Sequence, residues 1–261
     1  LLHPRHIEFQ ILGDKHGNVV VLGERDCSLQ RKNQKVIEEC PAAILSQKQR
    51  DDMIEICKTA AKKMGYFSTG TFEFMFEDGK FYFLETNTRL QVEHPVTEMV
   101  YGIDLVREQI RIAAGERLGY SQANIVPHGH AIEFRINAED PETFIPNPGT
   151  ITQYSPSGGL GVRVDSAVYT GYTIPPTYDS MIAKLIVHNA SRATCIMRAT
   201  RALDEFVIEG VKTTIPLHKK LLNNRDFRQL NFDNHWLEHY LSSEPNPGDE
   251  ITPISEQKQE E

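Results

Sequence analysis

Two aromatic-rich segments separated by an Asp-Gly pair constrain the fold of this chain more than any other feature. The segments are TFEFMF at residues 71–76 and KFYFL at residues 80–84, with Asp78 and Gly79 between them. Such segments on both sides of a short turn are typical of an antiparallel β-hairpin. Their five phenylalanines and one tyrosine indicate that at least one face of the sheet is buried.

The predicted hairpin carries one glutamate on each arm, Glu73 and Glu85. A two-residue loop at Asp78 and Gly79 would pair residue 77 with residue 80 and put the glutamates on opposite faces. A three-residue loop, with Gly79 in the left-handed conformation, would put both on one face, and we expect this arrangement. Adjacent carboxylates repel unless a cation lies between them, and Mg²⁺ prefers such oxygen ligands. Asn87 would add an amide oxygen on the same side. On spacing alone, two solvated surface glutamates remain an alternative.

The segment LETNTRLQVEHP, residues 84–95, places a polar side chain at every second position. These residues are Glu85, Asn87, Arg89, Gln91 and Glu93. A half-buried strand alternates in this way, with its polar face toward water. An arginine flanked by two acids and two amides is also consistent with the wall of a site that holds ions.

Composition argues against several classes of protein. The formal net charge of the 261-residue chain is -8, which is unfavourable for a general nucleic-acid surface. No apolar run approaches the ~20 residues that a membrane-spanning helix requires. The four cysteines lack the paired spacing of a metal site and the density of a disulfide framework, so a reducing compartment is the simpler interpretation.

Two helices and a second hairpin are predicted in the first 126 residues. Residues 6–12 and 19–22 alternate as the two strands of that hairpin. Ser46 caps a helix that Gly65 ends, and Asp104 begins another that Gly115 ends. The apolar residues expected to face inward are Met53, Cys57, Ala60 and Met64 in the first helix and Val106 and Ile110 in the second.

The apolar periodicity that indicates strands and helices is lost between residues 119 and 129, and we place a domain boundary near Pro127. Beyond it, residues 131–136, 161–166 and 181–188 read as strands. A helix after Ser191 should bury residues 196, 199, 203 and 206, and a shorter one after Thr214 presents residues 217 and 221. The predicted class is α+β, with domains at 1–126 and 127–241 and a disordered acidic tail at 242–261. The start without methionine leads us to expect a fragment that lacks its N-terminal part.

Several long motifs, in order along the chain, resemble those of the biotin carboxylases. They are ERDCSLQRKNQKVIEECP at 24–41, Glu73 with Glu85-Thr86-Asn87, RLQVEHPVTE at 89–98, HAIEFRINAEDP at 130–141 and GYTIPPTYDSMIAKLI at 171–186. The resemblance covers roughly residues 4–241. It implies the C-terminal half of an ATP-grasp fold, an antiparallel sheet with helices, followed by the C-terminal α+β domain of the family.

The resemblance also implies a role for individual residues. Metal would be held by Glu73, Glu85 and Asn87, and ATP would be contacted by His6, Gln30, Asn33, Glu73, Met75 and Glu85. Bicarbonate would be bound by Lys35, Arg89, Gln91 and Val92, and biotin would meet Arg135. The catalytic residues implied are Glu93, Arg89 and Arg135. Glu93 would be the general base, a role favoured by burial among apolar neighbours, and Arg135 would stabilise the biotin enolate.

As a member of this family, the chain would take part in the ATP-dependent carboxylation of biotin with bicarbonate, by way of carboxyphosphate. This is the first half-reaction of acetyl-CoA carboxylase in fatty acid synthesis. The implied cofactors and partners are ATP, Mg²⁺ or Mn²⁺, biotin on a carrier protein, carboxyltransferase subunits and a second copy of the chain, with Arg163 near the homodimer contact. The implied compartment is bacterial cytoplasm or plastid stroma.

Two other functions compete with this one. A different ATP-grasp ligase, such as half of a carbamoyl-phosphate synthase, would share Glu73, Glu85 and Asn87. A non-catalytic dimerisation fragment would need no missing half. The fragment itself is expected to be inactive alone.

Overall fold

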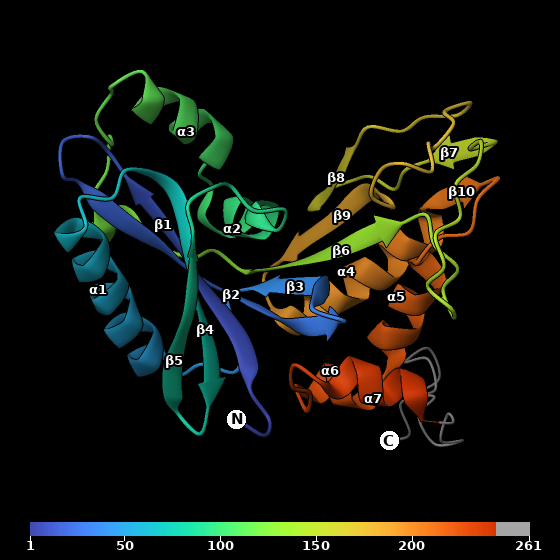
Figure 1. Ribbon diagram of the computed structural model, residues 1–261, viewed down its shortest axis with the longest axis horizontal. Helices are drawn as coiled ribbons and strands as arrows, with labels where there is room; N and C mark the ends of the chain where they lie inside the picture. The colour runs from blue at the N-terminus through green and yellow to red at the C-terminus, as the bar shows by residue number, and fades with distance from the viewer. Residues whose placement is uncertain (244–261) are drawn as a thin grey trace, which may run out of the picture.

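The computed structural model describes residues 1–243 (Figure 1). Its strands are β1 (Arg5–Gly13), β2 (Val19–Arg31), β3 (Gln34–Cys40), β4 (Ser68–Glu77), β5 (Lys80–Asn87), β6 (His130–Asn137), β7 (Gln153–Ser155), β8 (Val162–Ser166), β9 (Met181–Asn189) and β10 (Val207–Glu209). Its helices are α1 (Gln47–Lys63), α2 (His94–Tyr101), α3 (Leu105–Ala113), η1 (Gln122–Asn124), α4 (Arg192–Glu205), α5 (Ile215–Asn223), α6 (Arg225–Gln229) and α7 (Trp236–Ser242). This content confirms the α+β class.

One eight-stranded sheet runs through both halves of the molecule in the order β5-β4-β1-β2-β3-β6-β9-β8 (Figure 1). All of its pairings are antiparallel. The junction is the pairing of β3 with β6, in which Ile37 lies opposite Phe134. The sequence interpretation assigned no strand to residues 34–40, and this missed strand connects the two halves.

The alternation of β1 explains how a polar site arises on a buried sheet. Ile7, Phe9 and Ile11 belong to an apolar core with α1 and the phenylalanines of β4. The residues between them, such as Glu8 and Gln10, must therefore face the other side. On that side the polar side chains are covered as well, because both are at most 1% exposed.

The β4–β5 hairpin brings Glu73 and Glu85 together, but not by the predicted route. Glu77 pairs with Lys80, so the loop is the two-residue Asp78-Gly79 turn, with both residues at positive φ. A bulge then shifts the register between Glu73 and Phe74, so that Glu73 lies opposite Glu85. The prediction of a three-residue loop is wrong. One extra residue in β5 makes the same change of face that the longer loop would have made.

The helix caps follow the sequence, whereas two of the predicted buried faces do not. Ser46 makes a capping box with Gln49, and Asp104 accepts a hydrogen bond from the backbone of Arg107. In α3, however, Val106 and Ile110 are exposed, and the buried residues are Leu105, Glu108 and Ile112.

The reason is the direction from which α3 meets the sheet. Leu105 and Ile112 pack on Leu12, Val20 and Leu22 of β1 and β2. In α1, likewise, Met64 lies past the helix end and is exposed, and Ala61 takes the buried position instead of Ala60.

Helices cover both faces of the second half of the sheet. Helix α4 buries Ile196, Ala199, Leu203 and the following Phe206 in the core formed with β6 and β9, as predicted. Leu217 and Leu221 of α5 join the same core. On the other face, α2 packs Val96 and Val100 against β3, β6 and β9. Helix α2, which the sequence interpretation missed, covers the charged face of the sheet.

The predicted acidic tail falls mainly outside the described residues, which end at 243; Ser242 itself closes α7. Among the described helices, none combines the length and apolarity needed to cross a bilayer.

Candidate active site

A cavity of about 700 Å³ opens on the charged face of the sheet. It is bounded by β1, the β2–β3 turn, the β4–β5 hairpin, the loop at residues 88–93 and β6. The predicted site residues that line it are His6, Gln30, Asn33, Lys35, Glu73, Met75, Glu85, Asn87, Arg89, Gln91, Val92, Glu93 and Arg135. The structure therefore brings all of the predicted site residues to one cavity.

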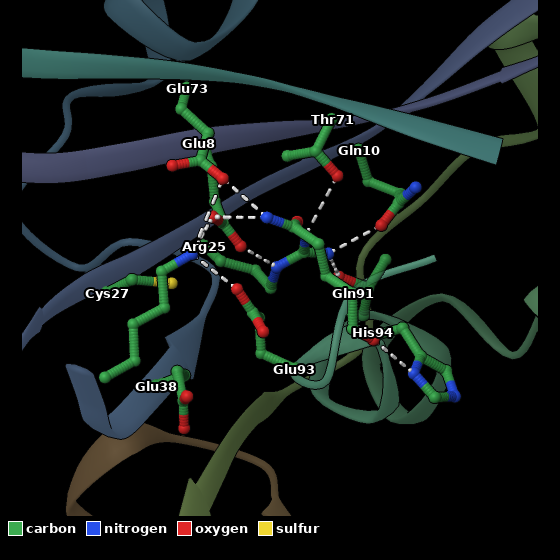
Figure 2. A network of polar contacts seen from close by, with 12 residues as sticks. Glu8, Gln10, Arg25, Cys27, Glu38, Thr71, Glu73, Gln91, Glu93 and His94 are labelled. Atoms are coloured by element: carbon green, nitrogen blue, oxygen red, sulfur yellow. Dashed lines mark hydrogen bonds and ion pairs between the residues drawn. The ribbon is translucent and has the colours of Figure 1, made fainter. Parts of the chain in front are cut away.

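A fully buried arginine, Arg25, lies within a network of polar side chains that includes Gln91 of the cavity wall (Figure 2). Its guanidinium donates hydrogen bonds to five side chains: Glu8, Gln10, Thr71, Gln91 and Thr97. These partners come from β1, β4, the loop at 88–93 and α2, so one cation joins four segments. A buried charge requires such compensation, since an unpaired one would cost several kcal/mol.

Glu8 connects Arg25 to the cavity. Its carboxylate accepts hydrogen bonds from Arg25 Nε at 2.5 Å and from Lys35 Nζ at 2.6 Å. Burial alone would raise the pKa of Glu8, but the charges of Arg25 and Lys35 outweigh it and lower the pKa to about 2. Glu8 is therefore ionised at neutral pH, and it holds Lys35 at the floor of the cavity.

Glu73 and Glu85 face a common point beside Asn87. Asn87 Nδ2 donates to Glu73 Oε1 at 2.7 Å and to Glu85 Oε1 at 3.0 Å. Burial raises the pKa of Glu73, but the hydrogen bond from His6 and the charge of Lys35 lower it to about 2. Rotation of the Asn87 amide by 180° would turn its Oδ1 toward the same point. Two carboxylates and one amide oxygen fit a hard cation such as Mg²⁺.

His6 and Gln30 form a hydrogen-bonded chain with Glu73 along one side of the cavity. The ring of His6 makes hydrogen bonds through Nε2 to Glu73, at 2.7 Å, and through Nδ1 to Gln30 Nε2, at 3.0 Å. His6 is 6% exposed, so both ring nitrogens make these contacts within the protein. Among the described residues, His6, Glu8 and Glu73 place ligand atoms within 4.8 Å of one another.

Glu93 lies between two cations. One carboxylate oxygen accepts a hydrogen bond from Lys35 at 2.5 Å, and the other accepts one from Arg135 at 3.0 Å. The residue is 2% exposed, as predicted, but its surroundings are charged. The expectation of apolar neighbours is therefore wrong, because Lys35 and Arg135 converge on this carboxylate from β3 and β6.

Arg135 is held by Glu38 and Glu93. Glu38 lies opposite Glu133 in the β3–β6 ladder, and both are fully buried. Both carboxylate oxygens of Glu133 and one of Glu38 have no hydrogen-bond partner in the described structure. Burial raises the pKa of Glu38 to about 7 and that of Glu133 well above its usual value.

Three predicted residues line the cavity and make few polar contacts with the other site residues. Arg89 is exposed, and its guanidinium donates a hydrogen bond to the carbonyl of Leu90 at 3.3 Å, so the structure does not pair it with either neighbouring acid. Met75 is half-buried at the cavity wall. Asn33 lies at φ 61° in the turn between β2 and β3, a conformation that asparagine tolerates better than most residues.

Sequence reasoning missed the charged residues behind the cavity: Glu8, Arg25, Glu38, Glu133 and Lys184. The residues of β1 and β6 alternate as in a solvated strand, which is the usual interpretation of such a pattern. A signal was present in the sequence, because Glu8 and Glu133 are each flanked by apolar residues that the core requires. Only the position of α2 shows that their own face is covered.

Two family models match the chain. Residues 1–121 match the carbamoyl-phosphate synthase L chain, ATP binding domain, and residues 133–239 match the biotin carboxylase C-terminal domain. Over 241 residues the chain is 54% identical to the biotin carboxylase of Haemophilus influenzae, covering 92% of this chain and 54% of that protein. The chain belongs to the biotin carboxylase family.

Other relatives in the biotin carboxylase family carry the names of different carboxylases. One pyruvate carboxylase subunit, from Methanothermobacter thermautotrophicus, is also 54% identical, over 92% of this chain and 49% of that protein. The biotin carboxylase domain dimer of 2-oxoglutarate carboxylase from Hydrogenobacter thermophilus, solved with MgADP, ADP and bicarbonate, superposes with a TM-score of 0.90. It is 52% identical and covers 92% of this chain and 53% of that one. The chain spans about half the length of the curated relatives it matches.

Proposed function

We propose that this chain supplies the bicarbonate-binding and biotin-binding half of an ATP-dependent biotin carboxylase. The observation that carries the proposal is the convergence of Lys35 and Arg135 on Glu93 at the cavity that also contains Glu73, Glu85 and Asn87. One cavity thus combines a cation-binding donor set with a base flanked by two anion-binding cations. The nucleotide and bicarbonate bound to the 2-oxoglutarate carboxylase domain support this reading.

Each group has a chemical task in this proposal. Mg²⁺, when bound at Glu73, Glu85 and Asn87, would neutralise charge on the phosphates of ATP. Lys35, Arg89 and Gln91, with the backbone of Val92, bind bicarbonate, since a guanidinium and an ammonium match a small planar anion.

Proton transfer is assigned to Glu93. It accepts the bicarbonate proton, and the freed oxygen attacks the terminal phosphorus of ATP to give carboxyphosphate and ADP. Carboxyphosphate separates into CO₂ and phosphate, and the phosphate takes the N1′ proton of biotin. Arg135 then stabilises the enolate oxygen as a fixed cation, before the nitrogen attacks CO₂. Glu38, bound to Arg135 Nε, keeps the guanidinium oriented.

The finer assignments are part of the same proposal. Biotin is presented on a carrier protein, carboxyltransferase subunits take up the carboxyl group, and the acceptor is acetyl-CoA in fatty acid synthesis, with the enzyme in bacterial cytoplasm or plastid stroma. A second copy of the chain meets this one near Arg163. That arginine is oriented by Asp165 and Glu98 and is only partly buried, which fits a contact surface. We also propose that the chain divides into two domains between residues 126 and 127.

The test uses the complete enzyme that contains this chain. ATP hydrolysis should require both bicarbonate and biotin, and Glu93→Gln should reduce it by roughly 10²- to 10⁴-fold, the usual contribution of a general base. Glu205→Gln makes the same chemical change on the exposed face of α4 and should leave the rate unchanged.

Two outcomes would contradict the proposal. Hydrolysis that proceeds equally without biotin, or that requires ammonia, would favour a ligase of the carbamoyl-phosphate synthase type, whose ATP-binding domain gives its name to the model matched by residues 1–121. Undiminished turnover in Glu93→Gln would remove the assigned base.

A further inference from the structure

The loop at residues 88–93 has no helix or strand of its own, yet it carries most of the proposed bicarbonate contacts. The side chain of Gln91 is fixed by Arg25 and Glu73, and that of Glu93 by Lys35 and Arg135. Val92, between them, has no polar side chain. Val92 can therefore make polar contacts through its backbone alone.

Lys184 supplies one such contact. Its Nζ donates a hydrogen bond to the carbonyl oxygen of Val92 at 2.7 Å. The two residues are 92 positions apart in the sequence. Lys184 lies in β9, within the region matched by the second family model, whereas the loop lies within the region matched by the first. Other hydrogen bonds to carbonyls of the loop come from Arg89, His94 and Val96. They are made within three residues along the chain and cannot fix the loop against the second half.

The position of Lys184 in the sheet explains why its ammonium turns to a carbonyl. It lies directly between Arg135 of β6 and Asp165 of β8 in the strand register. Asp165 is already occupied, because both of its oxygens accept hydrogen bonds from Arg163 at 2.8 Å. Lys184 Nζ stays 3.8 Å from that carboxylate, and its side chain is only 13% exposed. A mostly buried ammonium requires hydrogen-bond acceptors, and Val92 provides one.

The same segment is held a second time through α2. Arg163 donates to Glu98 at 2.6 Å, and Glu98 lies in α2, the helix that directly follows Glu93. The contacts from Lys184 to Val92 and from Arg163 to Glu98 therefore join β9 and β8 to the loop and to the helix that follows it. This geometry sets the distance between Glu93, which comes from the first half, and Arg135, which comes from the second.

We propose that Lys184 is a positioning residue for bicarbonate, which holds the backbone of Val92 so that the anion-binding groups of the loop stay aligned with Lys35 and Arg135. The inference rests on the proposed function of that loop. Without the contact, the loop would keep its side-chain bonds but lose its anchor to β9. Displacements of about 1 Å at a reacting centre can reduce rates by roughly 100-fold.

Two variants and one control test the proposal in the complete enzyme. Lys184→Met keeps the length of the side chain but removes the donor, whereas Lys184→Arg retains a donor and the charge. Lys212→Met removes an exposed lysine that pairs with Asp140, and neither residue lines the cavity. We expect Lys184→Met to raise the KM for bicarbonate by roughly 10- to 100-fold, the effect of losing one hydrogen bond to a charged group, with little change in the KM for ATP.

Hydrogen exchange measured by mass spectrometry separates the tether from the chemistry. Lys184→Met should accelerate amide exchange in peptides covering residues 88–93 and leave β1 unchanged, and Lys184→Arg should restore much of the protection and of the bicarbonate KM. Unchanged exchange in the loop would show that the hydrogen bond from Lys184 to Val92 does not hold the loop, whatever the KM values are. Faster exchange with an unchanged bicarbonate KM would overturn the positioning role, and a rise in the ATP KM of the same size would show a general structural defect. Hydrolysis that does not depend on biotin in the unmutated enzyme would instead refute the proposed function.

Discussion

Replacing Arg25 with methionine is the most direct test of what stabilises the charged face of the sheet. Methionine fills a similar length but donates no hydrogen bond. The substitution would leave the buried Glu8 with a hydrogen bond from Lys35 at 2.6 Å and a longer one from Gln91 at 3.5 Å. It would also take a donor from Gln10, Thr71, Gln91 and Thr97. Breaking a buried ion pair by removing one partner costs about 3–5 kcal/mol. We therefore expect the free energy of unfolding to fall by about 4 kcal/mol.

A double-mutant cycle identifies the origin of that cost. Glu8→Gln removes the charge left behind, so Arg25→Met with Glu8→Gln should be less destabilised than the sum of the two single variants, by about 1–3 kcal/mol. Urea unfolding followed by circular dichroism gives each value from the shift in midpoint at constant slope. Arg201→Met is the matched control, because Arg201 makes an exposed pair with Glu205 on α4, and it should cost less than about 1 kcal/mol.

Either of two results would refute this reasoning. One is a loss below about 1 kcal/mol in Arg25→Met, which would mean that the five hydrogen bonds contribute no more than a surface pair. The other is additivity within about 0.5 kcal/mol in the cycle, which would show that Glu8 does not depend on Arg25.

Two further predictions concern a helix cap and a buried acid. Ser46→Ala should cost about 1 kcal/mol of stability in thermal or urea unfolding, since it removes the capping box of α1, and Lys48→Ala on the same turn should not. Glu38, whose pKa is about 7 in the fold, binds its proton more tightly there than in the unfolded chain. Its contribution to stability is therefore present below about pH 4.5 and is lost as the pH rises through 7. The stability of the unmutated protein relative to Glu38→Gln should fall by about 3 kcal/mol between pH 5 and pH 8, as measured by urea unfolding; a constant difference would contradict the assignment. His218, whose pKa is lowered to about 4, shifts stability the opposite way in both proteins and cancels in the comparison.

The sequence predicted the hairpin and the pairing of its two acids, but not the geometry that produces the pairing. Local signals such as Asp78-Gly79 identify a turn, and the turn formed as a two-residue loop. The bulge beside Phe74 has no local signature in the sequence, because nothing marks Leu84 as the extra residue. Bulges of this kind satisfy the packing of a whole sheet, here the contact of Phe74 with Phe83, and so depend on tertiary structure.

The error in α3 has a related cause. Val106 and Ile110 are spaced by four residues, which is the right period for a buried stripe, but Leu105 and Ile112 are spaced by seven, which is also a helical period. Both pairs satisfy the amphipathic pattern, and they differ by about a third of a turn around the helix. The choice between them was made by the apolar patch that Leu12 and Leu22 present on the sheet.

The sequence did not show that the charged residues behind the cavity are buried, and the reason is physical. A strand with apolar residues on one face and charges on the other normally covers a core and meets water. Here the second face of β1, β2, β3 and β6 is covered by α2 and the loop before it, so Glu8, Arg25 and Glu133 are buried. Because those groups lie on one continuous sheet, opposite charges from segments far apart in the sequence are brought together. The pairing of β3 with β6 brings Arg135 to Glu93, and the contacts of Lys184 and Arg163 reinforce it. Disruption of the Ile37–Phe134 pairing should therefore move the two groups apart even with every proposed catalytic residue intact.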